Sequence, residues 1–373
     1  MPNIDNLGNV LIRSDLNVPI KNGEITDYYR ILKSVEIVKK ISDKSRTITF
    51  VSHLGRPDGK DLKLSLRPVA EKMSEILDKE VHFIEETYGE KVERQIETSE
   101  SKIFLLENLR YEKGETDNDK NFSKQITKPF DSYIFDAFGA AHREHASVVS
   151  FGENLKSFQG PLMDKEIKEL DKLLNNSEFG YSVLLGGAKI SDKLNLIEKL
   201  LPKVENLMVG GGMCFTLLKA LGYEIGKSLL EESFISKAEE LLNSDNGQKI
   251  ILPTDFGVTD SIDNSDRVNI KFSDFKNHHI GIDIGPQTVS DFEKILNKSK
   301  NIFWNGPMGI FEKEEFSYGT RKITEAISNL SGYTCIGGGD SVSAINKFSN
   351  KKYFNHISTG GGASLEYLEG KKL

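Results

Sequence analysis

Four apolar, strand-like runs in the second half of the chain end abruptly in glycines, at positions 186–187, 210–212, 337–339 and 360–362. Glycine has no Cβ, so its backbone reaches positive φ and approaches a ligand closely. Where a strand leads into a helix, such a turn presents N–H groups to an anion. Tight packing between strand and helix is the alternative reason for any single glycine turn. Four such turns favour a phosphate-rich ligand, such as a nucleotide.

Short β-like runs alternate with helical ones along the whole chain. The β-like runs are 10–12, 47–51, 103–106, 133–135, 182–185, 207–209, 249–252, 301–304 and 333–336. Apolar residues at helical spacing predict one helix with Asp27 near its cap and with Ile31, Val35, Val38 and Ile41 on one face. Another is predicted to open at Arg67-Pro68. Alternating β and α elements predict an α/β fold with doubly wound parallel sheets, covered by helices on both faces.

The length of 373 residues predicts two domains rather than one. The boundary is expected near Gly160-Pro161, where an amphipathic helix begins and leads into the polar loop 175–178. A helix that bridges two doubly wound domains would leave a cleft between them, and a cleft is the expected place for a site.

The overall composition is typical of a soluble cytosolic protein. Hydrophobic residues make up 38% and charged residues 28%, and Met1–Asp5 contains neither the basic region nor the apolar core of a signal peptide. Cys214 and Cys335 lie in apolar runs and cannot form a disulfide framework, which favours a reducing compartment. The net charge of -7 argues against nucleic acid as the main partner. We therefore expect a cytoplasmic, enzyme-like protein without a membrane or nucleic-acid partner.

Arginine is concentrated in the first half, where eight of the ten precede residue 150. Arginine binds phosphate or carboxylate through a planar fork, and ligands of open α/β sheets gather at the carboxyl ends of strands. Four strands deliver an arginine there, namely Arg13, Arg56, Arg110 and Arg143, and Arg30 lies in the first turn of the first helix. Any one of them could be a solvated surface residue. Their recurrence at equivalent positions predicts a basic pocket for a small, multiply anionic substrate.

Other polar residues accompany these arginines. Asp15 and Asn17 suit hydrogen bonds to substrate hydroxyls, although Asp15 could equally pair with an arginine. His53 is interpreted as a phosphate or substrate contact, and His142 and His145 are interpreted as structural residues.

Lysines and a carboxylate accompany the glycine turns. Lys189 and Lys193 are four residues apart, on one face of a predicted helix, so they can reach different phosphates of one ligand. Asp340 offers a carboxylate to Mg²⁺, which needs only one or two protein carboxylates besides phosphates and water. The alternative is that Asp340 and Ser341 cap a helix, and both roles are compatible.

These segments together resemble the phosphoglycerate kinase family. The motifs that carry the resemblance run in order through almost the whole chain: RSDLNVP at 13–19, SHLGRP at 52–57, ENLR at 107–110, DAFGAAHR at 136–143, GAK at 187–189, WNGPMG at 304–309, GGGD at 337–340 and TGGGAS at 359–364. The resemblance implies two Rossmann-like domains joined by a helix and a hinge. Residues 1–160 would bind 3-phosphoglycerate, 161–176 would form the interdomain helix and 177–359 would bind the nucleotide, while a tail of about 360–373 returns to the first domain.

The resemblance also implies the reaction and its residues. The reaction is a reversible, Mg²⁺-dependent phosphoryl transfer between 1,3-bisphosphoglycerate and ADP, giving 3-phosphoglycerate and ATP in glycolysis and gluconeogenesis, with hinge-bending closure of a monomer. The residues that look like the 3-phosphoglycerate site are Asp15, Leu16, Asn17, Arg30, His53, Leu54, Gly55, Arg56, Arg110 and Arg143. Those that look like the nucleotide site are Gly187, Lys189, Lys193, Gly281, Asn305, Glu312, Gly338, Gly339, Asp340 and Ser341. The catalytic residues by this resemblance are Arg30, Lys189, Gly338 and Gly361, and Asp340 looks like the Mg²⁺ ligand.

Two other classes of function match parts of the sequence. A nucleotide-binding regulatory or scaffold protein would keep the glycines but would not need Arg30, Lys189, Lys193 and Asp340, all of which are present. An NAD-dependent dehydrogenase is disfavoured because no G-x-G-x-x-G motif follows a strand and because arginine is in surplus.

Overall fold

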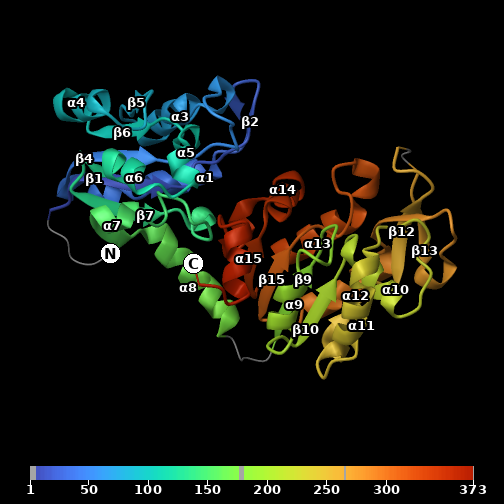
Figure 1. Ribbon diagram of the computed structural model, residues 1–373. Coiled ribbons are helices and arrows are strands. Elements are labelled where there is room, and N and C mark those ends of the chain that lie inside the picture. The colour runs from blue at the N-terminus through green and yellow to red at the C-terminus, as the bar shows by residue number, and fades with distance from the viewer. Residues whose placement is uncertain (1–5, 176–179, 264–265, 373) are drawn as a thin grey trace. The chain divides into compact units, whose positions relative to one another are not determined.

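The computed structural model describes residues 6–175, 180–263 and 266–372 of the chain (Figure 1). The start at Met1–Asp5 and residues 176–178 of the predicted polar loop lie outside the described residues. The chain forms two compact units, Met1–Ile167 and Lys168–Leu373, and the division falls within helix α8 (Pro161–Leu174). Among the described residues, no helix combines the length and the apolar character that crossing a membrane requires.

The first unit is built on a six-stranded parallel sheet with the order β5-β6-β4-β1-β7-β8. Its strands are β1 (Gly8–Ser14), β4 (Ser45–Val51), β5 (His82–Ile84), β6 (Ile103–Leu106), β7 (Ser132–Asp136) and β8 (Lys156–Gln159). A small hairpin adds β2 (Ile20–Lys21) and β3 (Glu24–Ile25). Residues 9–14 of the central strand β1 are all buried, because helices cover both faces of the sheet.

The helices of the first unit are α1 (Tyr29–Val35), α2 (Val38–Ile41), α3 (Arg67–Leu77), α4 (Glu90–Thr98), α5 (Lys113–Thr116), α6 (Lys120–Thr127) and α7 (Phe151–Asn154). The prediction of one helix that carries both Ile31 and Ile41 was wrong, because α1 and α2 are separate. The Glu36 N–H bonds to the Lys33 carbonyl, three residues back, which interrupts the helical hydrogen-bond pattern. Asp27 does lie near the cap: it precedes Tyr28, the N-cap residue of α1, and its side chain accepts from the Tyr29 N–H at 2.9 Å.

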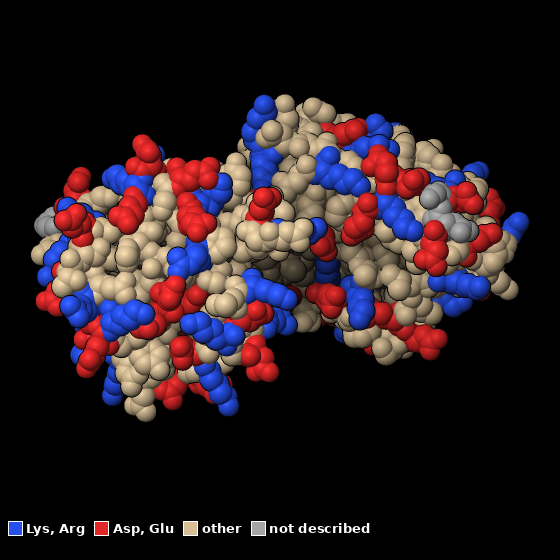
Figure 2. Space-filling view, turned by 90° about the horizontal axis from the view of Figure 1, so that it is seen from above, with Lys and Arg blue, Asp and Glu red and all other residues tan. Residues whose placement is uncertain are grey.

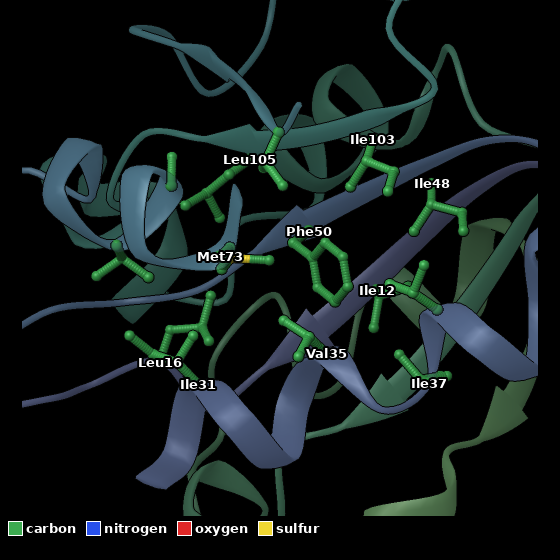
Figure 3. Close-up of a cluster of buried hydrophobic side chains, with 14 of the residues drawn as sticks. Ile12, Leu16, Ile31, Val35, Ile37, Ile48, Phe50, Met73, Ile103 and Leu105 are labelled. Atoms are coloured by element: carbon green, nitrogen blue, oxygen red, sulfur yellow. The ribbon is translucent and has the colours of Figure 1, made fainter. Parts of the chain in front are cut away.

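A hydrophobic core lies between α1, α3 and the sheet of the first unit. Figure 3 shows Val35 of α1 pointing toward Phe50 of β4, with Met73 of α3 beside Phe50, and Ile31 of α1 next to Leu16. Burying such a side chain contributes about 1.5–3 kcal/mol to folding. This packing holds α1, which carries Arg30, against the strands that carry the other predicted substrate residues.

The second unit is built on another six-stranded parallel sheet, with the order β11-β10-β9-β15-β16-β17. Its strands are β9 (Tyr181–Leu185), β10 (Asn206–Val209), β11 (Ile250–Ile251), β15 (Asn301–Asn305), β16 (Tyr333–Gly337) and β17 (His356–Ile357). Its helices are α9 (Leu194–Leu200), α10 (Met213–Ala220), α11 (Ile235–Leu242), α12 (Pro286–Leu296), α13 (Tyr318–Ser328), α14 (Gly339–Phe348) and α15 (Gly362–Leu368), and α15 packs against α9. The predicted fold class of two α/β domains with parallel sheets is confirmed.

An antiparallel sheet in the second unit was not predicted. β12 (Asp255–Thr259) lies between β13 (Val268–Lys271) and β14 (Ile280–Ile284) and pairs with both in antiparallel fashion. The connections between these strands are too short for the crossover helix that a parallel pair needs, so they pair as neighbours.

Charged side chains of both signs are interspersed on the surfaces of both units, in the face shown in Figure 2. Figure 2 shows no extended area of a single sign there. This face therefore offers no broad basic patch that would bind an anion.

Candidate functional site

A cavity lined by arginines lies at one edge of the first sheet. The strands β6, β4, β1 and β7 are parallel neighbours, so the loops after them meet at their carboxyl ends. Arg56, Arg110 and Arg143 from these loops line a cavity of about 700 Å³, together with Lys113 and His145. We call it the arginine cavity. The structure brings together three of the four strand-end arginines, and their role as substrate ligands stays a prediction.

Two guanidinium groups of the arginine cavity keep unused donors. Nη1 of Arg110 donates to the Gly55 carbonyl at 2.6 Å. Nη2 of Arg110 and Nε of Arg143 are buried and find no hydrogen-bond acceptor among the residues that the structure describes. Burial, together with Arg143 and Arg13, lowers the pKa of Arg110 to about 10, so its guanidinium is still charged at neutral pH. A buried donor without a partner costs about 1–3 kcal/mol, which a bound anion would offset.

Arg13 does not line this cavity, and its prediction as a pocket arginine was wrong. Its side chain is 1% exposed because β1 is buried on both faces. Its guanidinium donates inward to Ser147 Oγ at 2.8 Å and contacts His53 Nδ1 at 2.8 Å. Ser147 in turn donates to Glu115, which is also fully buried.

Arg13 determines the protonation of His53. Arginine only donates hydrogen bonds, so Nδ1 of His53 must accept and the ring proton lies on Nε2. Burial, followed by the charge of Arg13 and other arginines, lowers the pKa of His53 well below 6.5. His53 is therefore a neutral donor through Nε2, as a phosphate or substrate contact requires.

Asp15, Asn17 and Arg30 form a network with the arginine cavity. Nη1 of Arg30 lies 2.9 Å from each carboxylate oxygen of Asp15, which is the arginine pairing that the sequence left open. The Asn17 side chain accepts from the Gly55 N–H at 3.0 Å, and the carbonyl of Gly55 accepts from Arg110. Nη1 of Arg30 also donates to the Asn17 carbonyl at 3.3 Å, so five predicted substrate residues are connected through hydrogen bonds.

Leu16 and Leu54, also predicted at the substrate site, lie with their side chains in the core, at 0% and 3% exposed. The Leu54 main chain is held on both sides by Asn108, which accepts from its N–H and donates to its carbonyl. Any ligand contact of either leucine would therefore involve the main chain.

A second cavity, of about 270 Å³, lies in the second unit and is walled largely by glycines and apolar residues. We call it the glycine-lined cavity. Of the predicted nucleotide residues, Gly187, Gly281, Glu312 and Asp340 line it. The others lie outside its lining: Lys189, Lys193, Asn305, Gly338, Gly339 and Ser341.

The first two glycine turns serve close packing, and the N–H groups of Gly186, Gly187, Gly210 and Gly211 are all used within the protein, contrary to the prediction. The Gly187 N–H donates to the Pro307 carbonyl at 2.9 Å, and the Gly211 N–H donates to the Met308 carbonyl at 3.0 Å. A Cβ on Gly186 would lie 2.0 Å from the Pro307 oxygen. Glycine is needed here because three loop segments touch through their backbones, and these turns then wall the cavity.

The third glycine turn does open directly into a helix. Gly338 has φ +89°, and α14 begins at Gly339. The first N–H groups of a helix have no partner within it, and its dipole favours an anion there. Ser341 accepts from the Gly306 N–H at 2.6 Å, whereas Asp340 is exposed on the cavity lining. Gly361 (φ +55°) precedes α15 in the same manner.

The two predicted phosphate lysines are not on one helix face, because α9 begins only at Leu194. Lys189 is exposed, while Lys193 is 9% exposed and donates to the Asn305 carbonyl at 3.0 Å. Burial lowers the pKa of Lys193 to about 8, and Asp340 opposes this shift. Lys193 therefore remains mostly charged at pH 7 and lies beside Gly306, near the cavity.

Two groups of lining residues were missed by the sequence analysis. Phe215 and Phe256 form an apolar wall, with their ring centroids 5.1 Å apart. Both lie in apolar runs that gave no sign of a cavity. His145 lines the arginine cavity although it was interpreted as structural, and the nearby His142-Arg143 was the available signal.

The chain is similar to known proteins over nearly its whole length. A sequence model of the family described as phosphoglycerate kinase matches residues 5–371. The chain is 47% identical to the phosphoglycerate kinase of Dictyoglomus turgidum over 369 residues, which is 98% of this chain and 93% of that protein. It is 44% identical to that of Borreliella afzelii, covering 98% and 94%. The structure of phosphoglycerate kinase from Coxiella burnetii matches with a TM-score of 0.86 at 36% identity, covering 100% of this chain and 95% of the other.

Proposed function

The chain belongs to the phosphoglycerate kinase family, a family of phosphotransferases, and we propose that it transfers a phosphoryl group reversibly between 1,3-bisphosphoglycerate and ADP. The products in the forward direction are 3-phosphoglycerate and ATP. The observation that carries this proposal is the convergence of three arginines, two with unused donors, on one cavity in a unit separate from the glycine-lined cavity. The arginine cavity would hold the three-carbon acid, and the glycine-lined cavity would hold the adenine nucleotide.

The reaction needs no general base. In either direction the nucleophile is already an anion, a carboxylate or a terminal phosphate oxygen. Catalysis must then come from alignment of the two substrates and from stabilising the charge on the transferring group. We assign this charge stabilisation to Arg30 and Lys189, with the N-terminal amides of α14 and of α15, at Gly338 and Gly361, as further donors.

Asp340 suits the Mg²⁺ that accompanies the nucleotide. Its carboxylate is exposed on the cavity lining at the start of α14, and Mg²⁺ takes one or two carboxylates together with phosphate oxygens. When bound there, Mg²⁺ would neutralise charge on the phosphates. Glu312, exposed on the same lining, would accept hydrogen bonds from the ribose hydroxyls.

The two substrates bind to different units, so we propose that the units close on each other around a hinge, with residues 161–176 as the interdomain helix. Alignment of bound reactants contributes about 7–11 kcal/mol, so failed closure would abolish most of the rate enhancement. The same proposal includes domains 1–160 and 177–359 and a tail of about 360–373 that returns to the first domain. It also includes a cytoplasmic monomer in glycolysis or gluconeogenesis, which the buried thiols of Cys214 and Cys335 suit.

A coupled assay tests the proposed reaction. The purified chain is given 3-phosphoglycerate, ATP and Mg²⁺, and the acyl phosphate that forms is reduced by a coupling dehydrogenase with NADH. We expect NADH oxidation that depends on all three additions. Binding of MgADP without turnover would contradict the proposed reaction and would favour the nucleotide-binding scaffold.

A further inference from the structure

Two histidines and an aspartate meet at one end of the antiparallel sheet. Asp260 directly follows β12, and His278-His279 directly precede β14. Thr259 pairs with Ile280 across these two strands, so the residues just beyond that pair are brought side by side. A turn at 277–278 places both imidazole rings at this end, with their centroids 4.5 Å apart.

The three side chains have the geometry of a metal site. One possible ligand atom from each residue lies within 4.8 Å of the others, and Nε2 of His278 lies 3.6 Å from Oδ1 of Asp260. Within residues 6–175, 180–263 and 266–372, no other group of three His, Cys, Asp or Glu residues meets this criterion. Ligand atoms around a tetrahedral Zn²⁺ ion lie about 3.3 Å apart, which follows from bond lengths of about 2.0–2.1 Å. Asp260 and His278 are exposed, so small rotations would bring them to that separation.

One existing contact would change on binding. Nδ1 of His279 accepts from the exposed Lys276 N–H at 3.1 Å. A cation at this nitrogen would displace a hydrogen bond worth about 1 kcal/mol, and water can then serve the N–H. Oxygen ligands alone would suit Mg²⁺, whereas two imidazoles with one carboxylate suit Zn²⁺ and its neighbours in the transition series.

The other histidine cluster is electrostatically unsuited to a cation. Burial, followed by the charges of nearby arginines, lowers the pKa of His53 and of His145. The same charges repel a metal ion. Around His278 the nearest opposite charge is the carboxylate of Asp260, which attracts one.

We propose that Asp260, His278 and His279 form a binding site for a divalent transition-metal ion of the Zn²⁺ class, distinct from the Mg²⁺ that accompanies the nucleotide. Water fills the remaining coordination positions. The ion ties the ends of β12 and β14 together. Ile280 and Gly281, which follow His279, line the glycine-lined cavity, so the ion stiffens one of its walls.

The test is a calorimetric titration of the tag-free chain with Zn²⁺ in excess Mg²⁺, which occupies hard-oxygen sites such as Asp340. We expect one Zn²⁺ per chain. His278→Ala and Asp260→Asn each remove one ligand from an exposed position, so both variants should fold normally. Loss of an outer-shell partner alone typically weakens metal affinity about 10–100-fold, so loss of a ligand should weaken it at least about tenfold.

His82→Ala is the matched control, because His82 also has a carboxylate nearby, Glu80 at 4.0 Å, but belongs to no group of three. It should bind Zn²⁺ like the wild type. Electron paramagnetic resonance with Cu²⁺ as the probe should show coupling to two imidazole nitrogens, reduced to one in His278→Ala. Unchanged Zn²⁺ affinity in both ligand variants, absent binding in the wild type, or a spectrum without two nitrogens would each overturn the site.

Occupation of the site should also be visible in stability. A ligand that binds only the folded chain stabilises it by mass action. Zn²⁺ in excess Mg²⁺ should therefore raise the melting temperature of the wild type and of His82→Ala, and not of His278→Ala. An equal shift in all three would place the ion elsewhere and overturn the site.

Discussion

The arginine cavity and the glycine-lined cavity both lie in units built on six-stranded parallel sheets. The first is formed mainly by charged side chains, whereas the second is formed mainly by backbone and apolar side chains. The arginine cavity uses long side chains, and Arg110 and Arg143 each keep there a buried donor without an acceptor among the described residues. The glycine-lined cavity uses backbone and apolar walls, and Gly187 and Gly211 spend their N–H groups on neighbouring loops. Side-chain charge suits a small polyanion, whereas a wall of backbone and apolar side chains suits a partly apolar ligand.

The largest expected effects come from the residue of each unit to which charge stabilisation is assigned. Arg30→Ala or Lys189→Ala should lower kcat about a hundredfold or more, because each removes one donor that stabilises the transferring group. The loss should appear in kcat rather than in substrate affinity. Steady-state kinetics in the coupled assay, with binding measured separately, gives both quantities.

Arg94→Ala is the matched control, since Arg94 is exposed on α4 and away from both cavities. Its kcat should stay within about twofold of the wild type, as for an ordinary surface substitution. If the turnover of Arg30→Ala or Lys189→Ala stayed within a few-fold of the wild type, with binding unchanged, that residue would not stabilise the transferring group as assigned.

The next effect tests the close-packed backbone of the glycine-lined cavity. Gly186→Ala should destabilise the second unit by about 1–3 kcal/mol, because overpacking a filled site costs this much. Its Cβ would meet the Pro307 oxygen at 2.0 Å and the Met308 side chain at 2.7 Å. Denaturant unfolding gives the free energy, and MgADP titration gives the effect on the cavity.

Gly339→Ala is the control within the same unit, because a Cβ at Gly339 would meet no atom of the described residues within 4 Å. Its stability should equal that of the wild type within about 0.5 kcal/mol, as for other substitutions that disturb no contact. Equal stability of both variants would mean that Gly186 is not required for close backbone packing. It would contradict the description of this cavity as one walled by close-packed backbone.

The sequence predicted two kinds of feature: those that follow from local residue patterns, and those that follow from the shared direction of parallel strands. Parallel strands place their carboxyl ends together, so Arg56, Arg110 and Arg143 could be expected in one place. The start of α3 at Arg67-Pro68 also follows from local signals, since Pro is favoured in the first turn.

What the sequence could not predict depends on which segments meet in space. In the sequence, Arg13 stands near the end of a strand, as the other pocket arginines do. In the structure, it lies in a strand covered on both faces, and its side chain is buried. The N–H groups of Gly187 and Gly211 are used because the loop at 307–308 reaches them, which no local pattern encodes. Asp260 and His278 are distant in the sequence and come together because β12 pairs with β14.

A smaller effect tests whether Arg13 positions His53 within the arginine cavity. Arg13→Met should raise the pKa of His53 toward 6.5 and let its proton occupy either nitrogen, since a lowering charge and the Nδ1 donor are lost. In the tautomer that donates to the substrate through Nε2, the buried Nδ1 of His53 would then accept no hydrogen bond, which costs about 1–3 kcal/mol. Because binding selects this tautomer, 3-phosphoglycerate should bind about tenfold more weakly. Nitrogen-15 NMR of the imidazole reports the tautomer directly.

Arg13→Lys keeps a positive donor and should restore part of the affinity. A variant that merely loses stability would leave the His53 tautomer unchanged, so the two explanations separate. A wild-type His53 with its proton on Nδ1 would contradict the proposed positioning.

The smallest effects are opposite pH dependences of the two cavities. Burial, with the charges of Arg110 and Arg143, lowers the pKa of His145 to about 4, so the unfolded chain binds the extra proton between about 4 and 6.5 and stability is lost as pH falls through that window. Burial raises the pKa of Asp283, which lines the glycine-lined cavity, to about 6 against the attraction of Arg267. Here the folded chain binds the extra proton, so stability is lost as pH rises from about 4 to 6.

His145→Gln and Asp283→Asn should therefore change the slope of unfolding free energy against pH in opposite directions, each by at most about 1.4 kcal/mol per pH unit, the value for one proton. Hydrogen exchange between pH 4 and 7 assigns each change to its unit, because local protection is measured residue by residue. His145→Gln should flatten the rise of stability with pH in the first unit, whereas Asp283→Asn should steepen it in the second. Slopes that shift in the same direction in both variants would contradict the prediction that His145 and Asp283 change stability with pH in opposite ways.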